Sequence, residues 1–572
     1  MIGINASPSE HSVVCEFFEL FKTPWEFCRR DRQYEVLLCV GDCDCNENAA
    51  KLILTYAGRK LPSDARDNIQ IASQRNDACN LSYKGIRVPI YGASVTFRGN
   101  GNGALVDEES GLAALHLLQS GGRVVARIGY DLFDEIRTLI TTGQPVANAS
   151  APTLELHIAL LRDLIVGAGI PLIEIPPVPD GYRFIACLTH DVDHPSIRQH
   201  KFDHTTLGFL YRALFGSLLD VCCGRKSLVS LLTNWAAALK LPLVHLGLAK
   251  DFWCEFDHYA KLEKGLPSSF FVIPFKDNPG RIGKGQAPSR RASRYGASDI
   301  AGDIRKLMSS GCEIGLHGID AWLDSSKGQE ELEEIRQITG LQDIEIGVRM
   351  HWLYFDEQSP TMLERAGAAY DSTVGYNQTV GFRAGTTQVY KPIEAAVLLE
   401  LPLHAMDTAL FFYAHLHLSP EEANQRIRAI IASAVRFGGC LTFNWHDRSI
   451  APERLWGDTY EVLIQELKNQ QAWFATATQA VAWFRKRRSA VFEHVSWGHD
   501  DLRVSISVDA RDEWPALLLR IYQAQPPQSV AAIGTDDSPR FFEVPFNQSI
   551  ETGIVVPHLV ERRESEKDQI LQ

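Results

Sequence analysis

Short apolar runs alternate with helical patterns between residues 182 and 488. The apolar runs are Phe184–Leu188, Ser269–Pro274, Cys312–Leu316, Ile344–Val348, Tyr370–Val374, Leu398–Leu403 and Cys440–Phe443. Ser419-Pro-Glu-Glu422 and Thr476-Ala-Thr-Gln479 each mark the start of a helix, because an N-cap is followed by a capping-box side chain. This alternation predicts parallel strands joined by crossover helices. Seven strands are enough to close, or nearly close, a distorted (β/α)7-type barrel, and a twisted open sheet is the alternative.

Residues 1–175 have the pattern of a separate N-terminal α/β domain. We expect strands at Tyr34–Gly41 and Val124–Ile128, helices at Ser110–Ser120 and Leu154–Ala168, and a turn at Gly99–Gly103. The proline-rich stretch Ile175–Gly181 is typical of a linker into the central domain.

An insertion of mostly helical pattern, about residues 196–251, separates the first two strands of the central domain. It lies beside the end of the first strand, so it is a candidate lid or partner surface, and a packing ornament is the alternative. Its most apolar segment, Leu207–Cys223, is interrupted by Arg212 and Asp220. That interruption favours a buried or surface-lying helix over one that crosses a membrane.

The C-terminal region, residues 490–572, has a different pattern from the rest of the chain. Apolar and polar residues alternate in Leu502–Val508 and again in Phe541–Pro545. We therefore expect a small β-rich appendage, which ends in a charged tail from Glu561.

Length and charge limit the classes of protein to consider. At 572 residues the chain is too long for one hydrophobic core, which agrees with the three segments 1–175, 182–488 and 490–572. The formal net charge of −13 argues against a nucleic-acid partner and against an anionic membrane, since both attract a basic face.

Targeting signals and cysteine usage bear on the compartment. The N-terminal residues have no basic stretch followed by an apolar one, so we expect no signal peptide and no transmembrane segment. The twelve cysteines are irregularly spaced, which predicts reduced thiols rather than a disulfide framework. We therefore predict a cytoplasmic protein.

Polar residues of the kinds that bind metals follow the apolar runs and never precede them. They stand in His190-Asp-Val-Asp-His194, Glu313-Ile-Gly-Leu-His-Gly-Ile-Asp320, Gly347-Val-Arg-Met-His-Trp352, Tyr370-Asp-Ser-Thr373, His404-Ala-Met-Asp407 and Asn444-Trp-His-Asp-Arg448. The carboxyl ends of parallel barrel strands converge at one face. Asp191 and Asp193 point to the same side of an extended chain, so one carboxylate can hold a metal while the other takes a proton from water. We therefore expect a shared metal or catalytic site.

These motifs resemble the polysaccharide deacetylase family, the NodB-homology or carbohydrate esterase family 4 group, over roughly residues 182–488. The matching motifs are Thr189-His-Asp-Val-Asp193, Glu313-Ile-Gly-Leu-His317, Arg349-Met-His-Trp352, Tyr370-Asp-Ser-Thr373 and Cys440-Leu-Thr-Phe-Asn-Trp-His-Asp447. The resemblance implies a distorted barrel of the NodB-homology kind. It also implies a metal-dependent hydrolase that removes N-acetyl groups from an acetamido sugar or glycan precursor.

The sequence departs from the family pattern at three positions. Val192 separates two aspartates that are usually adjacent, Ala321 stands where the family has a second histidine, and His351 stands where the family tends to have proline. The metal site is therefore short of one expected imidazole. Asp320 or His351 is the replacement, unless the site binds metal weakly or not at all.

The resemblance also assigns roles to residues. Asp193 and His317 would hold a divalent metal, with Asp320 or His351 completing the set, and nitrogen and oxygen ligands with an open position favour zinc. The metal would activate water and polarise the acetyl carbonyl group.

By the same analogy, three further residues carry the chemistry. Asp191 would remove the proton of the attacking water, and Arg349 would fix this base carboxylate. His446 would protonate the leaving amine. The expected partner is a carbohydrate or sugar-precursor substrate, and the sequence does not predict an oligomeric state.

Two other functions remain open at this stage. A catalytically impaired protein of the same fold, acting in glycan binding or assembly, would explain the missing histidine. A glycosidase with Asp191 and Asp193 as its carboxylate pair ranks last, because two residues on one strand are poorly placed to flank a glycosidic bond.

Overall fold

The computed structural model describes residues 1–42, 45, 50–98, 104–120, 122–201, 203–340, 345–498, 501–509, 514–523 and 540–555. The predicted turn at Gly99–Gly103 and the charged tail from Glu561 lie outside these residues.

A curled parallel sheet forms the core of the central domain. Its strand order is β18-β17-β14-β13-β20-β19, with β21 also paired to β13. The strands are β13 (Ile185–Val192), β14 (Ser268–Val272), β17 (Glu313–Gly318), β18 (Val348–Met350), β19 (Ala405–Met406), β20 (Cys440–Asn444) and β21 (Trp473–Phe474). Every neighbouring pair is parallel, which confirms the predicted α/β barrel class.

Two of the predicted barrel strands are much shorter than expected. The runs Tyr370–Val374 and Leu398–Leu403 make only isolated bridges, from Val348 to Asp371 and from Asp371 to Glu400. The prediction of full strands at these two runs is wrong. Each run pairs with its neighbour at too few residues to form the continuous hydrogen bonding of a strand. The bridges still extend the sheet beyond β18 and bring these segments to the same rim.

Helices pack around the barrel sheet. They are α8 (Phe256–Leu262), α9 (Ala301–Ser309), α10 (Ser325–Thr339), α11 (Ser359–Ala366), α12 (Asp407–Phe411), α13 (Pro420–Phe437), α14 (Gly457–Asn469) and α15 (Ala477–Ser489). The predicted starts are confirmed, since Ser419 and Thr476 cap α13 and α15 with complete capping boxes. A small hairpin, β15 (Arg281–Ile282) and β16 (Gly285–Gln286), lies between β14 and α9.

The N-terminal domain contains a six-stranded sheet of order β10-β11-β4-β3-β1-β2. Its strands are β1 (Ile2–Asn5), β2 (Trp25–Phe27), β3 (Val36–Val40), β4 (Leu52–Tyr56), β10 (Leu115–Ser120) and β11 (Arg123–Ile128). Shorter strands form two small sheets: β5 (Ile71–Arg75) with β8 (Ser94–Phe97), and β6 (Cys79–Tyr83) with β7 (Ile86–Ile90) and β9 (Leu105–Asp107). The helices are α1 (His11–Phe21), α2 (Pro62–Arg66), α3 (Leu132–Ile140) and α4 (Thr153–Gly167).

The predicted helix at Ser110–Ser120 is wrong. Residues 115–120 form β10, which pairs antiparallel with β11. Burial alternates along this segment: Leu115 and Leu117 are buried, whereas His116 and Leu118 are partly exposed. This is the two-residue period of a strand. Apolar residues at 115, 117 and 118 fit a helical face equally well. The sequence pattern therefore did not distinguish a helix from a strand at this position.

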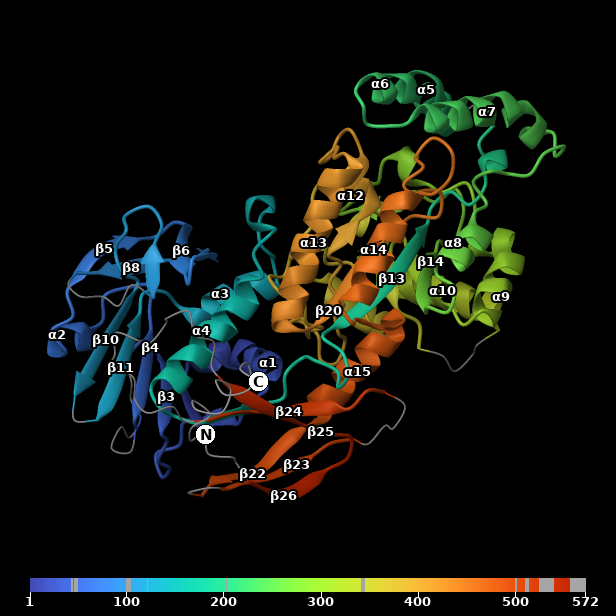
Figure 1. Ribbon diagram of the computed structural model, residues 1–572. Coiled ribbons are helices and arrows are strands. Elements are labelled where there is room, and N and C mark those ends of the chain that lie inside the picture. Colours follow the sequence, from blue (N-terminus) through green and yellow to red (C-terminus); the bar gives the residue numbers. More distant parts are fainter. Residues whose placement is uncertain are drawn as a thin grey trace, which may run out of the picture.

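The C-terminal region is β-rich, as predicted. One sheet has the order β22-β23-β26 and another the order β12-β24-β25. The strands are β12 (Leu172–Glu174), β22 (Val491–Trp497), β23 (Asp501–Ser507), β24 (Leu517–Tyr522), β25 (Phe541–Phe546) and β26 (Ile550–Val555). Because β12 precedes the barrel in sequence, the C-terminal strands also bind the end of the N-terminal domain (Figure 1).

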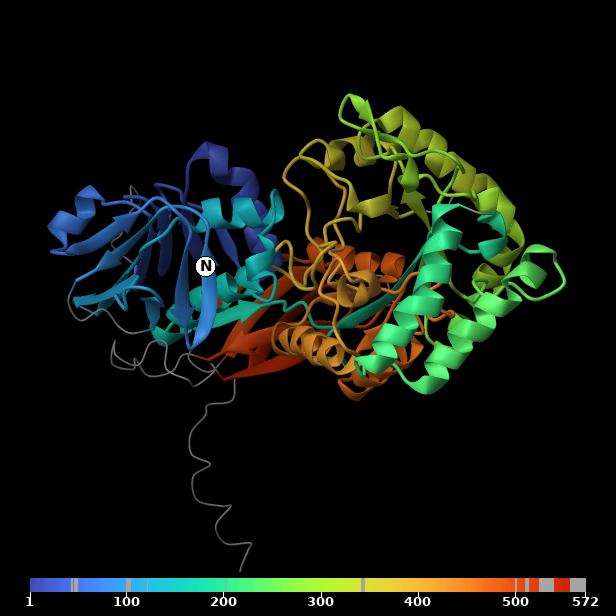
Figure 2. The same cartoon turned by 90° about the horizontal axis from the view of Figure 1, so that it is seen from above.

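The N-terminal domain and the barrel lie side by side (Figure 2). Buried polar contacts join them. Glu155 of α4 accepts hydrogen bonds from the Thr387 backbone N–H and the Thr386 hydroxyl, and the Arg487 guanidinium of α15 donates to the Leu20 carbonyl oxygen.

The insertion consists of helices that lie beyond the carboxyl end of β13 (Figure 1). It contains α5 (His204–Tyr211), a π-helical turn (Arg212–Gly216), α6 (Ser217–Cys222) and α7 (Leu228–His245), as the helical pattern predicted. The Ser196 hydroxyl donates to Asp251 Oδ2 over 2.6 Å, so the two ends of the insertion meet. Among the described residues, α7 alone has the length and apolar composition to span a membrane, and 28% of its apolar window is buried.

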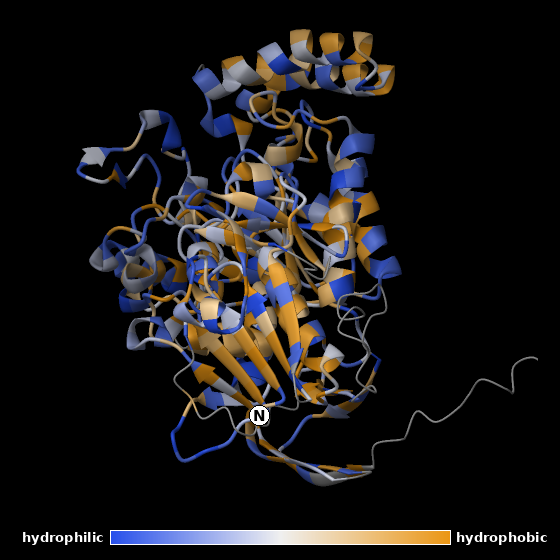
Figure 3. Ribbon diagram, turned by 90° about the vertical axis from the view of Figure 1, so that its left-hand side faces the viewer, coloured by the Kyte–Doolittle hydropathy of each residue, from blue (hydrophilic) through white to orange (hydrophobic). Residues whose placement is uncertain are grey.

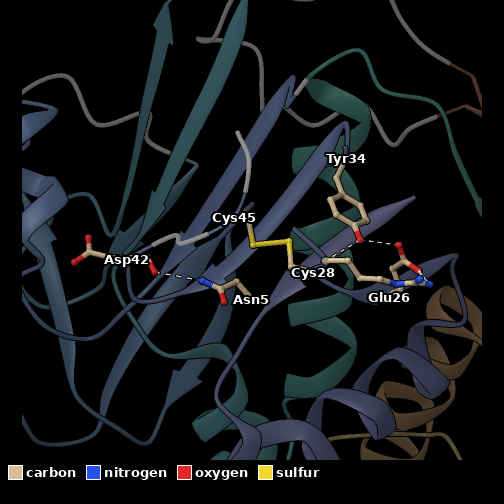
Figure 4. The surroundings of a disulfide bond; sticks show 7 residues. Asn5, Glu26, Cys28, Tyr34, Asp42 and Cys45 are labelled. Carbon is tan, nitrogen blue, oxygen red and sulfur yellow. Dashed lines mark hydrogen bonds and ion pairs between the residues drawn. A yellow bond between two sulfur atoms is a disulfide. The ribbon is translucent and has the colours of Figure 1, made fainter. Parts of the chain in front are cut away.

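A disulfide bond joins Cys28, which follows β2, to Cys45, which follows β3 (Figure 4). The prediction that the cysteines are reduced thiols is therefore wrong for this pair. The irregular spacing hid it, because one bridge leaves no repeating pattern in the sequence. Close by, the Tyr34 hydroxyl donates to Glu26 Oε1 over 2.6 Å and the Asn5 amide donates to the Asp42 carbonyl oxygen.

Candidate metal centre

Three side chains from three strand ends converge at the carboxyl rim of the barrel. They are Asp193 after β13, His317 in β17 and His351 after β18. His317 Nε2 lies 3.0 Å from His351 Nδ1 and 3.4 Å from Asp193 Oδ1, and His351 Nδ1 lies 3.2 Å from Asp193 Oδ1. Ligands about 2.0–2.2 Å from one zinc ion are spaced by roughly these distances.

Backbone carbonyl groups orient both imidazoles. His317 Nδ1 donates to the Arg349 carbonyl oxygen over 2.9 Å, and His351 Nε2 donates to the Arg291 carbonyl oxygen over 3.1 Å. In the neutral rings the remaining nitrogens, His317 Nε2 and His351 Nδ1, therefore face each other with lone pairs. Two lone pairs at 3.0 Å repel each other, and a cation between them removes the conflict. Outer hydrogen bonds of this kind typically accompany metal-binding histidines.

The third member of the triad offers a carboxylate oxygen. Asp193 Oδ1 is buried and accepts no hydrogen bond from the residues that the structure describes. Burial alone would raise the pKa of Asp193, but the neighbouring His351, His317 and His446 hold it well below its usual range. Burial lowers the pKa of His351, although Asp193 opposes this shift. An ionised carboxylate beside neutral imidazoles is the form that binds a metal, so the residues fit a divalent cation.

The structure places the two candidates for the third ligand, His351 and Asp320, differently. His351 belongs to the triad, and Asp320 does not. Asp320 Oδ1 instead accepts a hydrogen bond from the Arg281 backbone N–H over 2.8 Å, and the Asp320 N–H donates to Glu331 Oε1. His351, on the next strand along the sheet, therefore lies where it could take the place of the imidazole missing at Ala321.

The other predicted carboxylate, Asp191, lies next to the triad, with Oδ2 at 3.9 Å from His317 Nε2. Arg349 Nη1 donates to Asp191 Oδ1 over 3.0 Å, and Asn444 Nδ2 donates to Oδ2 over 2.8 Å. Arg349 is itself buried and also donates to the Thr189 hydroxyl. Asp191 is therefore held in place by Arg349 and Asn444.

His446 lies on the other side of Asp193. Its Nε2 is 3.8 Å from Asp193 Oδ2, while its Nδ1 is 2.6 Å from Asp407 Oδ1. Burial alone would lower the pKa of His446, but the buried Asp407 carboxylate reverses the effect and raises this pKa to about 9. The side chains of Asp193 and His446 are 19% and 11% exposed, so they stand where the site opens to solvent.

Sequence reasoning missed three residues that support the site. Asn444 fixes Asp191, Asp407 fixes His446, and Arg291 supplies the carbonyl that orients His351. Asn444 and Asp407 follow apolar runs, and that position was their signal in the sequence. No comparable signal marks Arg291, because the contact is made by its backbone.

Backbone strain accompanies the triad. Trp352 and Leu353, which directly follow His351, have φ angles of 64° and 53°. Bulky side chains adopt this left-handed conformation rarely, at a cost of order 1–3 kcal/mol each. The Trp352 carbonyl oxygen accepts a hydrogen bond from Asn377, which holds the turn in place.

Comparisons with known proteins give structural matches only. No protein-family model and no curated protein matches the sequence. A putative polysaccharide deacetylase from Mycobacterium smegmatis is 19% identical, with a TM-score of 0.35, over 55% of this chain and 95% of that one. A probable polysaccharide deacetylase from Pseudomonas aeruginosa PAO1 is 15% identical, with a TM-score of 0.34, over 55% and 94%.

A third match is a CE4 family pseudoenzyme from Bacillus anthracis, 10% identical with a TM-score of 0.26, over 54% of this chain and 68% of that one. The first two structures carry the name of the family that the sequence motifs resemble. Identities and TM-scores this low carry no information on chemistry, which depends on the side chains described above.

Proposed function

We propose that this protein is a metal-dependent hydrolase that removes N-acetyl groups from an acetamido sugar or glycan precursor. The observation that carries the proposal is the triad of Asp193, His317 and His351, in which two imidazole lone pairs and an unpaired carboxylate oxygen face one point. A divalent cation, with zinc favoured by this ligand set, would supply water activation and carbonyl polarisation when bound.

The remaining residues have roles that follow from their positions. Asp191 keeps lone pairs free beside the triad while Arg349 and Asn444 hold its plane, so it accepts the proton of the attacking water. His446 stands on the opposite side of Asp193 with Nε2 directed at the site, so it delivers a proton to the leaving amine. A base and an acid on either side of one metal site match the requirements of amide hydrolysis.

The substrate is expected to reach the site from the side of Asp193 and His446, where the site is partly exposed. We propose an N-acetylated sugar because the constellation resembles the deacetylase motifs, apart from the three departures at Val192, Ala321 and His351. The same chemistry would hydrolyse other acylated amines, so the assay must include several acyl donors.

The test is acetate release by the purified full chain, supplied with Zn²⁺, from an N-acetylhexosamine oligosaccharide and from a nucleotide-linked N-acetylhexosamine. Asp193→Asn keeps the shape of the side chain and should reduce release by at least about 100-fold. Asp257→Asn, at an exposed position outside the site, is the matched control and should retain full activity.

Metal analysis separates the two functions that the sequence left open. Stoichiometric metal together with acetate release supports the hydrolase. Stoichiometric metal without hydrolysis of any acyl donor would contradict the hydrolase and favour a glycan-binding role, and absence of metal would contradict the site itself.

A further inference from the structure

The helical insertion, residues 196–251, exposes two sets of large apolar side chains. On α7 they recur at helical spacing: Leu228, Leu232, Trp235, Leu239, Leu243 and Leu246. The chain from α5 to α6 exposes Leu207, Tyr211, Phe215, Leu218 and Leu219. Leu239 is 81% exposed and Leu232 is 63% exposed. Figure 3 shows repeated orange segments, interleaved with blue and pale ones, on the helices at the top of the molecule. An apolar surface of this extent marks an interaction site on a soluble domain.

The opposite face of α7 is already bound to the protein. Its buried residues are Leu231, Asn234, Ala237, Leu241 and Val244. Asn234 Oδ1 accepts a hydrogen bond from the Glu453 backbone N–H over 2.6 Å, which ties the helix to a loop of the barrel. This side of α7 is therefore held against the protein and is not available to lipid. The helix presents its apolar stripe outward.

The charge of the insertion is opposite to that of the whole chain. Residues 196–251 contain seven Lys and Arg but only three Asp and Glu, although the formal net charge of the chain is −13. Exposed basic residues lie near the apolar ones in the sequence: Arg198, Lys201, Arg225, Lys240 and Lys250, whereas the exposed Arg212 is paired with Glu453. The argument against an anionic membrane that the net charge provided therefore does not apply to this segment.

We propose that the apolar stripes of α5–α7 dock onto the surface of a membrane that contains anionic phospholipid. Leu, Phe and Trp side chains on one face with Lys and Arg beside them are the composition of helices that lie in a lipid–water interface. A symmetric pair of this chain is disfavoured as the occupant, because an isologous contact would bring two copies of the same basic patch together. The inference goes beyond the proposed hydrolase function and does not depend on it.

The experiment is flotation of the purified full chain with vesicles of phosphatidylcholine containing 30 mol% phosphatidylglycerol, and with vesicles of phosphatidylcholine alone. Binding should be several-fold stronger to the vesicles that contain phosphatidylglycerol, because Lys and Arg are attracted to an anionic surface. Leu232→Glu with Leu239→Glu should reduce the bound fraction at least tenfold. Both side chains are exposed, so the melting temperature should stay close to that of the wild type.

The matched control is Ile282→Glu with Val491→Glu, which places the same charges at exposed apolar positions outside the insertion and should leave flotation unchanged. Equal flotation of the Leu232/Leu239 variant and the wild type would overturn the proposal, since charge alone would then explain the binding. Failure of the wild type to float would also overturn it. A concentration-dependent dimer that the Leu232/Leu239 variant abolishes, without any flotation, would assign the surface to self-association instead.

Discussion

In the proposed metal site, His351 completes a ligand set that the sequence left one imidazole short. The choice between His351 and Asp320 depended on which strand end bends toward Asp193, and residue spacing does not reveal that bend. In the structure His351 Nδ1 faces His317 Nε2, whereas the Asp320 carboxylate accepts a hydrogen bond from the Arg281 N–H.

The two candidate ligands therefore give opposite predictions. His351→Ala should weaken Zn²⁺ binding by at least about 100-fold, because it removes one of three ligand atoms, and Asp320→Ala should leave the affinity within a few-fold of the wild type. The measurement is titration of the metal-free protein in competition with a chelating dye. His494→Ala, at an exposed position in β22, controls for loss of a histidine. Strong binding by His351→Ala would contradict the assignment.

Asp407 is a positioning residue in the proposed scheme. Its carboxylate fixes His446 through Nδ1, so Asp407→Asn should lower kcat by about 10- to 100-fold while KM changes little. Steady-state kinetics of acetate release measure the split between the two constants. Asp299→Asn, an exposed aspartate in the barrel domain, should behave as the wild type. A rise in KM with unchanged kcat would mean that Asp407 serves substrate binding instead.

At the level of elements, α4 contains a buried acid at the contact between two domains. Glu155 accepts hydrogen bonds from Thr386 and Thr387, yet its Oε2 has no hydrogen-bond partner among the described residues. Burial raises the pKa of Glu155 to about 7, and the threonine hydrogen bonds only partly offset it. The folded state thus binds this proton more tightly than the unfolded chain does.

The sign of the pH effect follows. The contribution of Glu155 to stability is complete below about pH 4.5 and is lost as pH rises through about 7, a change of roughly 3 kcal/mol. Glu155→Gln cannot ionise, so its melting temperature relative to the wild type should improve between pH 5 and pH 8. Glu421→Gln, at an exposed position of α13, should show no such trend. A constant difference between variant and wild type would show that the Glu155 proton is not linked to folding.

The sequence predicted elements well where the signal was local. Ser419 and Thr476 cap their helices as expected, because a capping box involves only four neighbouring residues. The strand β10 was predicted as a helix, because its partner β11 decides its conformation and that pairing is not visible in a short window. The strands expected around Asp371 and Glu400 shortened to bridges for the same reason.

The same division holds for the site. Asp191, Asp193 and His317 could be identified because they follow apolar runs within one motif each. The supporting roles of Asn444 and Asp407 require the distance between separate strand ends, so only the structure revealed them.

The cytoplasmic location of the whole molecule was predicted partly from cysteines that were expected to be reduced. The Cys28–Cys45 disulfide bond does not support that prediction. The bond joins residues 17 apart, and closing such a loop stabilises a fold by about 3 kcal/mol. Reducing agent should therefore lower the melting temperature of the wild type. It should have no effect on the Cys28→Ser/Cys45→Ser variant, which should melt at the lower temperature under both conditions.

Two measurements check this prediction. Thiol alkylation followed by intact mass determination counts the cysteines that react before and after reduction. Calorimetry of the Cys15→Ser variant, which removes an exposed free thiol, provides the control. Equal melting temperatures with and without reductant in the wild type would contradict a stabilising bond.

The meeting of Ser196 and Asp251 has a consequence for how this chain can vary. The chain leaves the end of β13 and returns to α8 at one place, so the path of the barrel backbone does not pass through the intervening helices. A short loop that joins residues 196 and 251 directly would remove the apolar stripes of α5–α7 from the chain.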